Sequence, residues 1–194
     1  MDVFTLVLSG FGLAAPAGLN AWLPLLITGL AAKFNLFGLT LNAPFDLLTE
    51  TWVLVIIGVL LTIEIFADKI PAVDTINDII HTFIRPVAGG ILFAAHSGAV
   101  GGMDPTLSFI LGMLSAGSVH AVKATSRPVI TATTGGIANP LVSMVEDIVA
   151  AGATVLALAA PLVAALLMGS ILALAGWVVW RWRQRRKRRR AAQI

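Results

Sequence analysis

Charge is scarce in this sequence and cysteine is absent. Only 12% of the 194 residues are charged, whereas 58% are hydrophobic. This balance, with a mean hydropathy of +0.93, lies far outside the range of water-soluble domains and indicates an integral membrane protein. Because there is no Cys, a disulfide framework and a thiolate metal site are both excluded.

Sequence signatures of common active sites are also lacking. The chain has no H-E-x-x-H, no G-x-S-x-G and no P-loop motif. His81, His96 and His120 could still meet carboxylates across helices, but no local spacing indicates a metal site. Clusters of Glu, Asp, Asn and Thr would suit a hard cation better than zinc. We therefore expect no enzyme and no cofactor, while the identity of any bound metal stays open.

Basic residues are concentrated near the C-terminus. The segment RWRQRRKRRR holds eight of the 13 Lys and Arg residues, which leaves five bases against ten acids in the rest of the chain. The segment follows an apolar run that ends in GWVVWRW, a pattern typical of a cytoplasmic membrane boundary. We interpret residues 181–194 as a basic cytoplasmic tail whose partners are membrane lipids and not nucleic acid.

The first uncharged run is too long for one straight spanning helix. Val3 to Ala32 would form a helix of about 45 Å, whereas a hydrocarbon core is about 30 Å thick. The run therefore tilts strongly or breaks. APAGLN, residues 15–20, is the natural break, because Pro16 and Gly18 weaken a helix and Asn20 can cap a new one.

The rest of the chain up to residue 180 predicts further helices. Residues 34–50 are interpreted as a partly apolar loop near a membrane interface. The predicted apolar helical segments are 51–67, 86–102, 106–124, 141–160 and 162–180. ITATTGGIANP, residues 130–140, predicts a broken or re-entrant segment, because Thr and Gly are poor material for a lipid-facing helix. We expect one all-α transmembrane domain over residues 1–180, a polytopic bundle of about six spanning segments, with seven as the alternative.

A weak internal repeat is visible. The aligned stretches are 56–69 with 110–123 and, at another offset, 73–80 with 142–149. The second alignment pairs Asp78 with Asp147. A true repeat would relate halves 1–85 and 86–160, inverted relative to each other as in many transporters, with 161–180 as an extra helix. Chance similarity between apolar helices is the alternative.

Charge gathers in ADKIPAVDTINDIIHTFIRP, residues 67–86. Placed on a helix, Asp74, Asp78, His81 and Arg85 fall within an arc of about 60°, opposite apolar side chains. In one interpretation this helix lies in the membrane interface with its charged face in water. In the other, the acidic character of that face indicates a functional site inside the bundle.

A second polar stripe is embedded in a long apolar stretch. It consists of Asn139, Ser143, Glu146 and Asp147. Intramembrane acids are costly and normally pair with other charges in a bundle interior or an aqueous cavity, which makes them functional candidates. Lys123 and Arg127 are the expected partners, because they share one helical face with His120 at i, i+3 and i+7.

We expect these stretches to build one substrate or ion pathway. The side chains predicted along it are Asn20, Glu64, Asp68, Lys69, Asp74, Asp78, His81, Arg85, His120, Lys123, Arg127, Thr134, Asn139, Ser143, Glu146 and Asp147. Glu64 and Asp68 share a face at i,i+4 and could bind a cation or carry protons. His96 is expected to be a hydrogen-bonded core residue. The alternative is that ion pairs among these residues only lock helices together.

Three ordered stretches resemble a known family. They are GLNAWLPLLITGLAAKF at 18–34, EIFADKIPAVD at 64–74 with HTFIRP at 81–86, and TTGGIANPLVSMVEDIVA at 133–150. Together they look like the bacterial membrane proteins catalogued as domain of unknown function 4126. The resemblance implies a polytopic inner-membrane protein and supplies no activity, cofactor or catalytic residue.

The leading expectation for function is a small bacterial inner-membrane transporter or channel. It would move an ion or small solute, coupled to protons or a cation through the intramembrane acids. A lipid or polyprenyl-phosphate binding or translocating protein is one alternative, because Arg and Lys commonly contact phosphate. A membrane scaffold subunit and a membrane-embedded enzyme are the others. The C-terminus is expected in the cytoplasm, and a homodimer would help so small a bundle enclose a pathway.

Overall fold

A computed structural model describes residues 3–67, 71–101 and 103–164, with single positions beyond them up to residue 184. Within these ranges all regular secondary structure is helical. Asp68 and Lys69, both predicted in the pathway, lie outside the described residues. The side chains of Asp74 and Asp78 are likewise outside the description.

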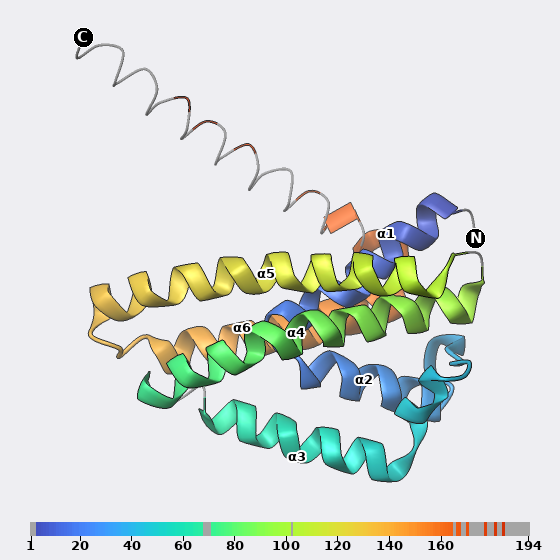
Figure 1. The fold of residues 1–194 in the computed structure, drawn as a ribbon, viewed down its shortest axis with the longest axis horizontal. Coiled ribbons are helices and arrows are strands. Elements are labelled where there is room, and N and C mark those ends of the chain that lie inside the picture. Colours follow the sequence, from blue (N-terminus) through green and yellow to red (C-terminus); the bar gives the residue numbers. More distant parts are fainter. Residues whose placement is uncertain are drawn as a thin grey trace.

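Within residues 3–159, apart from the gaps given above, six α-helices and three short 3-10 helices follow one another (Figure 1). In order they are α1 (Val3–Ala14), η1 (Ala15–Gly18), α2 (Trp22–Lys33), η2 (Leu36–Gly38), η3 (Phe45–Thr49), α3 (Thr51–Ala67), α4 (Pro71–Val100), α5 (Pro105–Thr134) and α6 (Asn139–Ala159). Helices α3 to α6 run up and down the length of the bundle. The predicted bounds of α3 agree with the observed ones.

The N-terminal run is broken where the sequence predicts. Helix α1 enters the bundle from one end, the chain turns over residues 15–21, and α2 returns to the same end (Figure 1). The Ser9 hydroxyl contacts His96 near the end of α4, and Lys33 in the last turn of α2 donates to the Thr49 carbonyl oxygen at 2.9 Å. We call residues 15–21 the hairpin turn.

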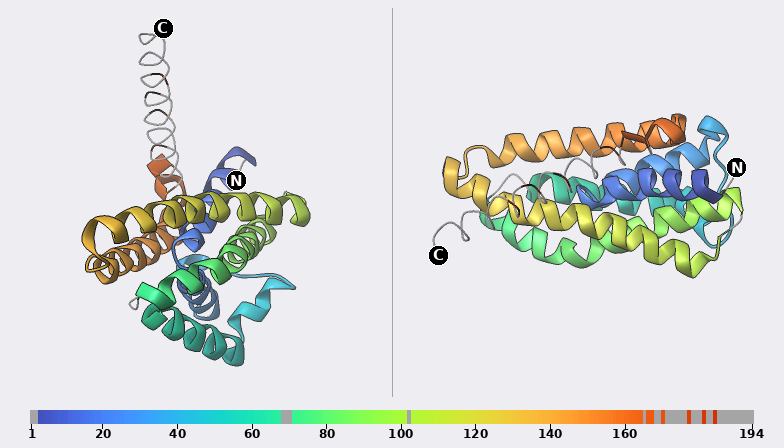
Figure 2. Two further views of the ribbon diagram at one scale, coloured as in Figure 1. Left: turned by 60° about the vertical axis from the view of Figure 1, so that its left-hand side comes forward. Right: turned by 90° about the horizontal axis from the view of Figure 1, so that it is seen from above.

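Helix α1 lies between the longer helices. It contacts α4, α5 and α6, and the view from above shows it between α6 and α5 (Figure 2). Phe11 stacks edge-to-face on Phe93 of α4, with ring centroids 5.3 Å apart. The hairpin turn therefore lies deep in the bundle.

Pro86, which begins a predicted helical segment, lies inside a long helix instead, and so does Pro128. Pro86 is within α4 and Pro128 within α5, each helix being 30 residues long. A Pro in a helix interior removes one hydrogen bond and crowds the preceding turn, which weakens the helix without necessarily ending it. Here α4 and α5 form the most extensive helix pair in the described part of the chain, and their packing supports the turns around each Pro.

The break predicted within residues 130–140 is observed as a turn between two helices, while the re-entrant alternative stays a prediction. Helix α5 continues to Thr134, a turn follows, and α6 begins at Asn139. The Thr133 and Thr134 hydroxyls donate to carbonyl oxygens one turn back, so Thr is accommodated in the helix. Gly135 ends α5 in the left-handed conformation, with φ of 60°.

The predicted inversion of two repeat halves finds no support in the helix directions. The first alignment relates α3 to α5, and these helices run in the same direction along the bundle (Figure 1). A repeat built on that alignment would be parallel.

Polar and apolar side chains are distributed in the reverse of the pattern expected in water. In α3 the one ionisable residue, Glu64, is buried, whereas Trp52, Val59 and Phe66 are exposed. Within the described residues, three helical stretches are long and apolar enough to cross a membrane: Ile79–Val100, Pro105–Thr134 and Asn139–Ala159. The shorter apolar helices are Leu6–Gly18, Trp22–Lys33 and Thr51–Ala67. Outward apolar faces on helices of this length indicate a membrane protein.

Close backbone contact holds α4, α5 and the hairpin turn together. A Cβ atom added at Gly112 of α5 would clash with the backbone oxygen of Gly89 on α4, and one at Gly18 would clash with the backbone oxygen of Ala116. Small residues at such crossings let helices approach and gain dispersion contacts, the main source of helix association in lipid.

We expect Gly112→Ala to lower the stability of the purified protein by about 1–3 kcal/mol through overpacking. The loss should occur although Ala is the better helix former by about 1 kcal/mol. The matched control is Gly152→Ala in α6, where an added Cβ meets nothing within 4 Å. Thermal unfolding of both variants in detergent would measure the difference, and equal melting temperatures would contradict the close α4–α5 contact.

Candidate functional site

Arg85 is the centre of a buried polar cluster near the hairpin turn. Its side chain is 0% exposed, and its Nη2 donates to Glu64 Oε1 of α3 at 2.9 Å. Its Nη1 donates to His120 Nδ1 of α5, also at 2.9 Å. Three helices thus contribute to what we call the Arg85 cluster: Glu64, His81, Arg85 and His120.

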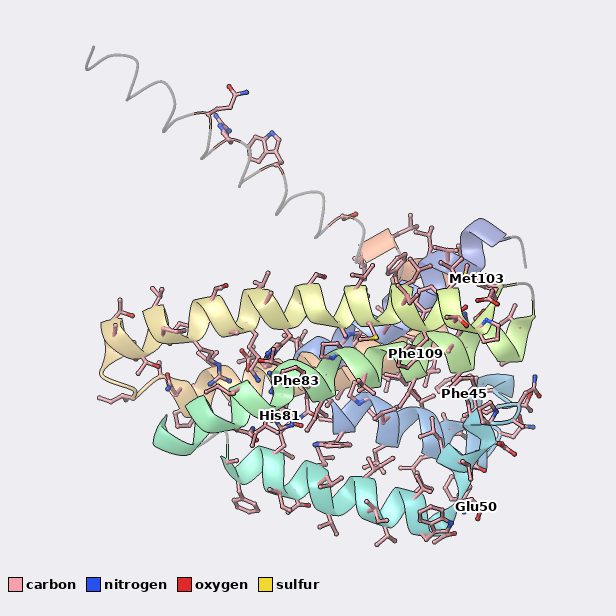
Figure 3. All side chains as sticks on the ribbon, in the orientation of Figure 1. Phe45, Glu50, His81, Phe83, Met103 and Phe109 are labelled. Carbon is pink, nitrogen blue, oxygen red and sulfur yellow. The ribbon has the colours of Figure 1, made fainter. Side chains whose placement is uncertain are left out.

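His81 completes the Arg85 cluster from one turn earlier on α4. Its Nε2 lies 3.4 Å from Glu64 Oε1, and its Nδ1 donates to the Asn77 carbonyl oxygen at 2.8 Å. The Trp22 ring meets the His81 ring edge-on, with centroids 6.5 Å apart. Figure 3 places His81 on the side of α4 that faces α3.

The burial of this cluster overturns the interfacial interpretation for the residues that are described. His81 and Arg85 are buried, while the apolar side chains of Ile79, Ile80 and Phe83 on the same helix are exposed. A helix lying in the interface would have the opposite arrangement, with charge in water and apolar groups covered. The charged face of α4 at His81 and Arg85 therefore points into the bundle.

A second cluster joins α5 and α6. Arg127 binds both carboxylate oxygens of Glu146, through Nε and Nη2. The Lys123 ammonium lies 3.2 Å from Glu146 Oε2. We call Lys123, Arg127 and Glu146 the Glu146 cluster. The predicted pairing of these two cations with an α6 acid is confirmed, and the bidentate geometry is the stronger form of such a pair.

The hairpin turn is bound to the surrounding helices by its own polar groups. The Asn20 amide oxygen accepts from the Trp22 and Leu23 backbone N–H groups, so Asn20 caps α2 as predicted. The Asn20 Nδ2 donates to Asp147 Oδ1 at 2.9 Å. The Leu19 carbonyl oxygen, freed by the interruption of the helix, accepts from Lys123 Nζ at 3.0 Å.

The remaining predicted side chains lie around the α5–α6 connection. Asn139 and Ser143 are buried on the inner face of α6, and Asn139 exchanges hydrogen bonds with the Thr131 hydroxyl. Thr134 is half-buried and donates to the Ile130 carbonyl oxygen.

His96 is buried with its Nε2 2.7 Å from the Ser9 hydroxyl, which fits a core histidine.

Polar side chains in the part of the chain that the structure describes do not converge as a metal site. No three His, Asp or Glu side chains there are grouped in the way that metal ligands are.

Several residues that contact the two clusters or the hairpin turn are uncharged, so a search for charged residues does not find them. Thr82 contacts His120 Nε2 at 3.1 Å, and Trp22 packs on His81. Thr131 lies one turn beyond Arg127, so extending the predicted face by four residues would have found it. Leu19 contributes its backbone carbonyl oxygen. The sequence signal for this contribution is the predicted break in the helix, which frees a carbonyl group.

A bundle with a paired, charged interior and outward apolar faces is typical of α-helical membrane proteins. Residues 7–181 match the sequence model of domain of unknown function 4126, and the chain belongs to that family. Comparison with curated proteins and with solved structures gave no match. The family match agrees with the resemblance seen in the sequence.

We expect Glu146→Gln to destabilise the protein strongly, because the buried cations Lys123 and Arg127 both lose a counter-charge. The loss of one partner from a buried ion pair typically costs on the order of 3 kcal/mol. The control is Glu50→Gln, an exposed acid beside the start of α3 (Figure 3), which should change stability by about 0.5 kcal/mol or less. Thermal unfolding of the two variants in detergent measures these losses of stability. A small effect of Glu146→Gln would show that the Glu146 cluster adds little to the stability of the protein.

Proposed function

We propose that the chain is a small membrane transporter or channel for an ion or small solute, and that the pathway passes the hairpin turn. The observation that carries the proposal is the burial of three cations, Arg85, Lys123 and Arg127, around an interrupted helix. Burying such charges has a desolvation cost of several kcal/mol each, and well-packed apolar residues would give equal or greater stability. Their presence supports a role beyond packing.

The hairpin turn offers the kind of groups that transporters use to contact solutes. In many such proteins, half-helix ends and unwound carbonyl groups meet near the membrane midplane. Here the Leu19 carbonyl oxygen and the N-terminus of α2 are both at the turn, where Lys123 and Asn20 contact them. A solute or ion entering this region would exchange its contacts with those of Lys123 and Asn20.

We infer a bacterial inner-membrane location with the basic tail in the cytoplasm, on the positive-inside pattern of residues 181–194. Helices α1 and α2 have 12 residues each, or about 18 Å, which is short for a core of about 30 Å. We therefore propose that they form a re-entrant hairpin, and that α3 to α6 and the helix predicted at 162–180 cross the membrane. That arrangement has five crossings, one fewer than the sequence predicts. A homodimer stays a prediction.

Lipid binding is the second candidate function, and one surface feature favours it. A groove of about 340 Å³ lies between α2 and α4. It is lined by Trp22, Leu25, Phe83, Ile84, Val87, Ala88 and Ile91. Its apolar walls could take an acyl or isoprenoid chain, and Trp22, one of its lining residues, also packs against His81 of the Arg85 cluster.

Flux measurements in proteoliposomes test the proposal. Protons, alkali cations and small solutes would be offered to the wild type, Asp147→Asn and the control Glu50→Gln. We expect Asp147→Asn to lower flux about tenfold, equivalent to about 1.4 kcal/mol in the barrier, because Asn20 loses its ionic partner at the hairpin turn. Glu50→Gln should match the wild type.

Two results would contradict the transport proposal. If the folded wild type moves nothing under any gradient, neither a transporter nor a channel is supported. If flux occurs but is the same in Asp147→Asn, the pathway does not pass the hairpin turn. Tight copurification of a lipid without flux would instead favour the second candidate.

A further inference from the structure

We propose that His81 binds one exchangeable proton against Glu64 and that this proton is the coupling ion of the proposed transport. Proton binding itself stands on the hydrogen-bond geometry of the Arg85 cluster. Its coupling to solute movement rests on the proposed function.

The hydrogen-bond partners define which His120 nitrogen carries hydrogen. Arg85 has only donors, so His120 Nδ1, 2.9 Å from Arg85 Nη1, must accept. The hydrogen of a neutral His120 then lies on Nε2, which donates to the Thr82 hydroxyl at 3.1 Å. A protonated His120 would place an N–H against the guanidinium. His120 is therefore a neutral partner of Arg85.

His81 carries a hydrogen on Nδ1, whereas His120 carries its hydrogen on Nε2. Its Nδ1 faces the Asn77 carbonyl oxygen at 2.8 Å, and a carbonyl can only accept, so Nδ1 carries a hydrogen. In a neutral imidazole Nε2 would then be an acceptor. This Nε2 is buried 3.4 Å from Glu64 Oε1 and makes no hydrogen bond, so a neutral His81 would hold its acceptor beside the acceptor oxygen of Glu64 with no donor between them.

A proton on His81 Nε2 resolves this opposition. The Nε2 lone pair takes up the proton, and the imidazolium faces the carboxylate as a cation beside an anion. Glu64 Oε1 also accepts from Arg85 Nη2 at 2.9 Å, a contact that favours the ionised carboxylate, so the proton belongs on His81.

The groups around His81 come from four helices. Glu64 approaches from α3, Arg85 is one turn on along α4, and His120 of α5 lies behind Arg85. The Trp22 ring of α2 covers the imidazole edge. Among the described side chains, Glu64 is the acid closest to Nε2.

Release of the proton would act on the hairpin turn through Trp22. Without the proton the His81 and Glu64 acceptors repel, while Arg85 keeps hold of Glu64, so His81 is the side chain that moves. Trp22 packs on His81, and its backbone N–H is bound by Asn20, which also binds Asp147. Trp22 and Asn20 thus connect the Arg85 cluster to Asp147. Protonation of His81 therefore favours one position of this segment of the hairpin over another.

Nitrogen NMR of the full chain in nanodiscs tests the protonation state. The chain has only three His residues, so His→Gln variants assign every imidazole signal. We expect two N–H groups on His81 at neutral pH in the wild type. In Glu64→Gln we expect loss of the Nε2 proton and a single Nδ1–H, because the carboxylate is gone. His120 should keep a single N–H on Nε2 in both proteins.

A single N–H on His81 in the wild type throughout about pH 5–8, the range in which His normally titrates, would overturn the proposal. So would an imidazolium that persists in Glu64→Gln. If Glu64→Gln does not fold, proton release during a pH increase is compared between the wild type and His81→Gln. The wild type should release one proton more per chain in that range, and an equal release would also overturn the proposal.

Coupling is tested separately in proteoliposomes. His81→Gln should lose the proton movement that accompanies solute flux, whereas the control His96→Gln should keep both the flux and the proton movement. If the NMR result is as expected and no solute is moved by the wild type, proton binding stands and the proposed transport fails. If flux and proton movement are unchanged in His81→Gln, the coupling role is wrong.

Discussion

The guanidinium of Arg85 lies where it has no exposure to solvent, and its contacts determine how three helices meet. Glu64 on α3 and His120 on α5 both bind it directly. Because an unpaired buried cation would be strongly destabilising, the positions of α3 and α5 around α4 are restricted to those that keep these contacts. The Glu146 cluster imposes the same restriction between α5 and α6. Helices with apolar exteriors gain little from hydrophobic burial in lipid, so polar pairs and close backbone contacts must specify their arrangement.

The hairpin turn depends on the Glu146 cluster and on Asp147, the next residue of α6. Its freed carbonyl at Leu19 is bound by Lys123, and its amide at Asn20 is bound by Asp147. An interrupted helix in an apolar interior leaves backbone groups that need partners. Lys123 therefore has two functions in the fold, since it neutralises Glu146 and also satisfies the broken backbone. The charged side chains and the break in the helix therefore depend on each other.

Much of this arrangement could be predicted from the sequence, and the failures have physical causes. The break at residues 15–20 follows from the length of an uncharged run and from Pro16, and the pairing of Lys123 and Arg127 with Glu146 follows from helical spacing. The direction in which the α4 face points could not be predicted, because an amphipathic helix has the same pattern whether its polar side meets water or other helices. Pro86 suggested a boundary, yet tertiary packing keeps the helix continuous. The convergence of Glu64, Arg85 and His120 joins positions far apart in the sequence, and no local pattern encodes it.

The proposed re-entrant hairpin would also make the two routes to its turn electrically unequal. In that arrangement α2, with 12 residues, would rise about 18 Å from the end where the hairpin enters, out of a hydrocarbon thickness of about 30 Å. A charge arriving at the turn from that end would cross more than half of the membrane potential, whereas one from the opposite end would cross less than half. With the full potential worth about 2.3 kcal/mol per charge at 100 mV, the longer route has the greater voltage dependence. Occupancy of the turn by a charged species would therefore respond to membrane voltage with a sign set by the orientation of the hairpin.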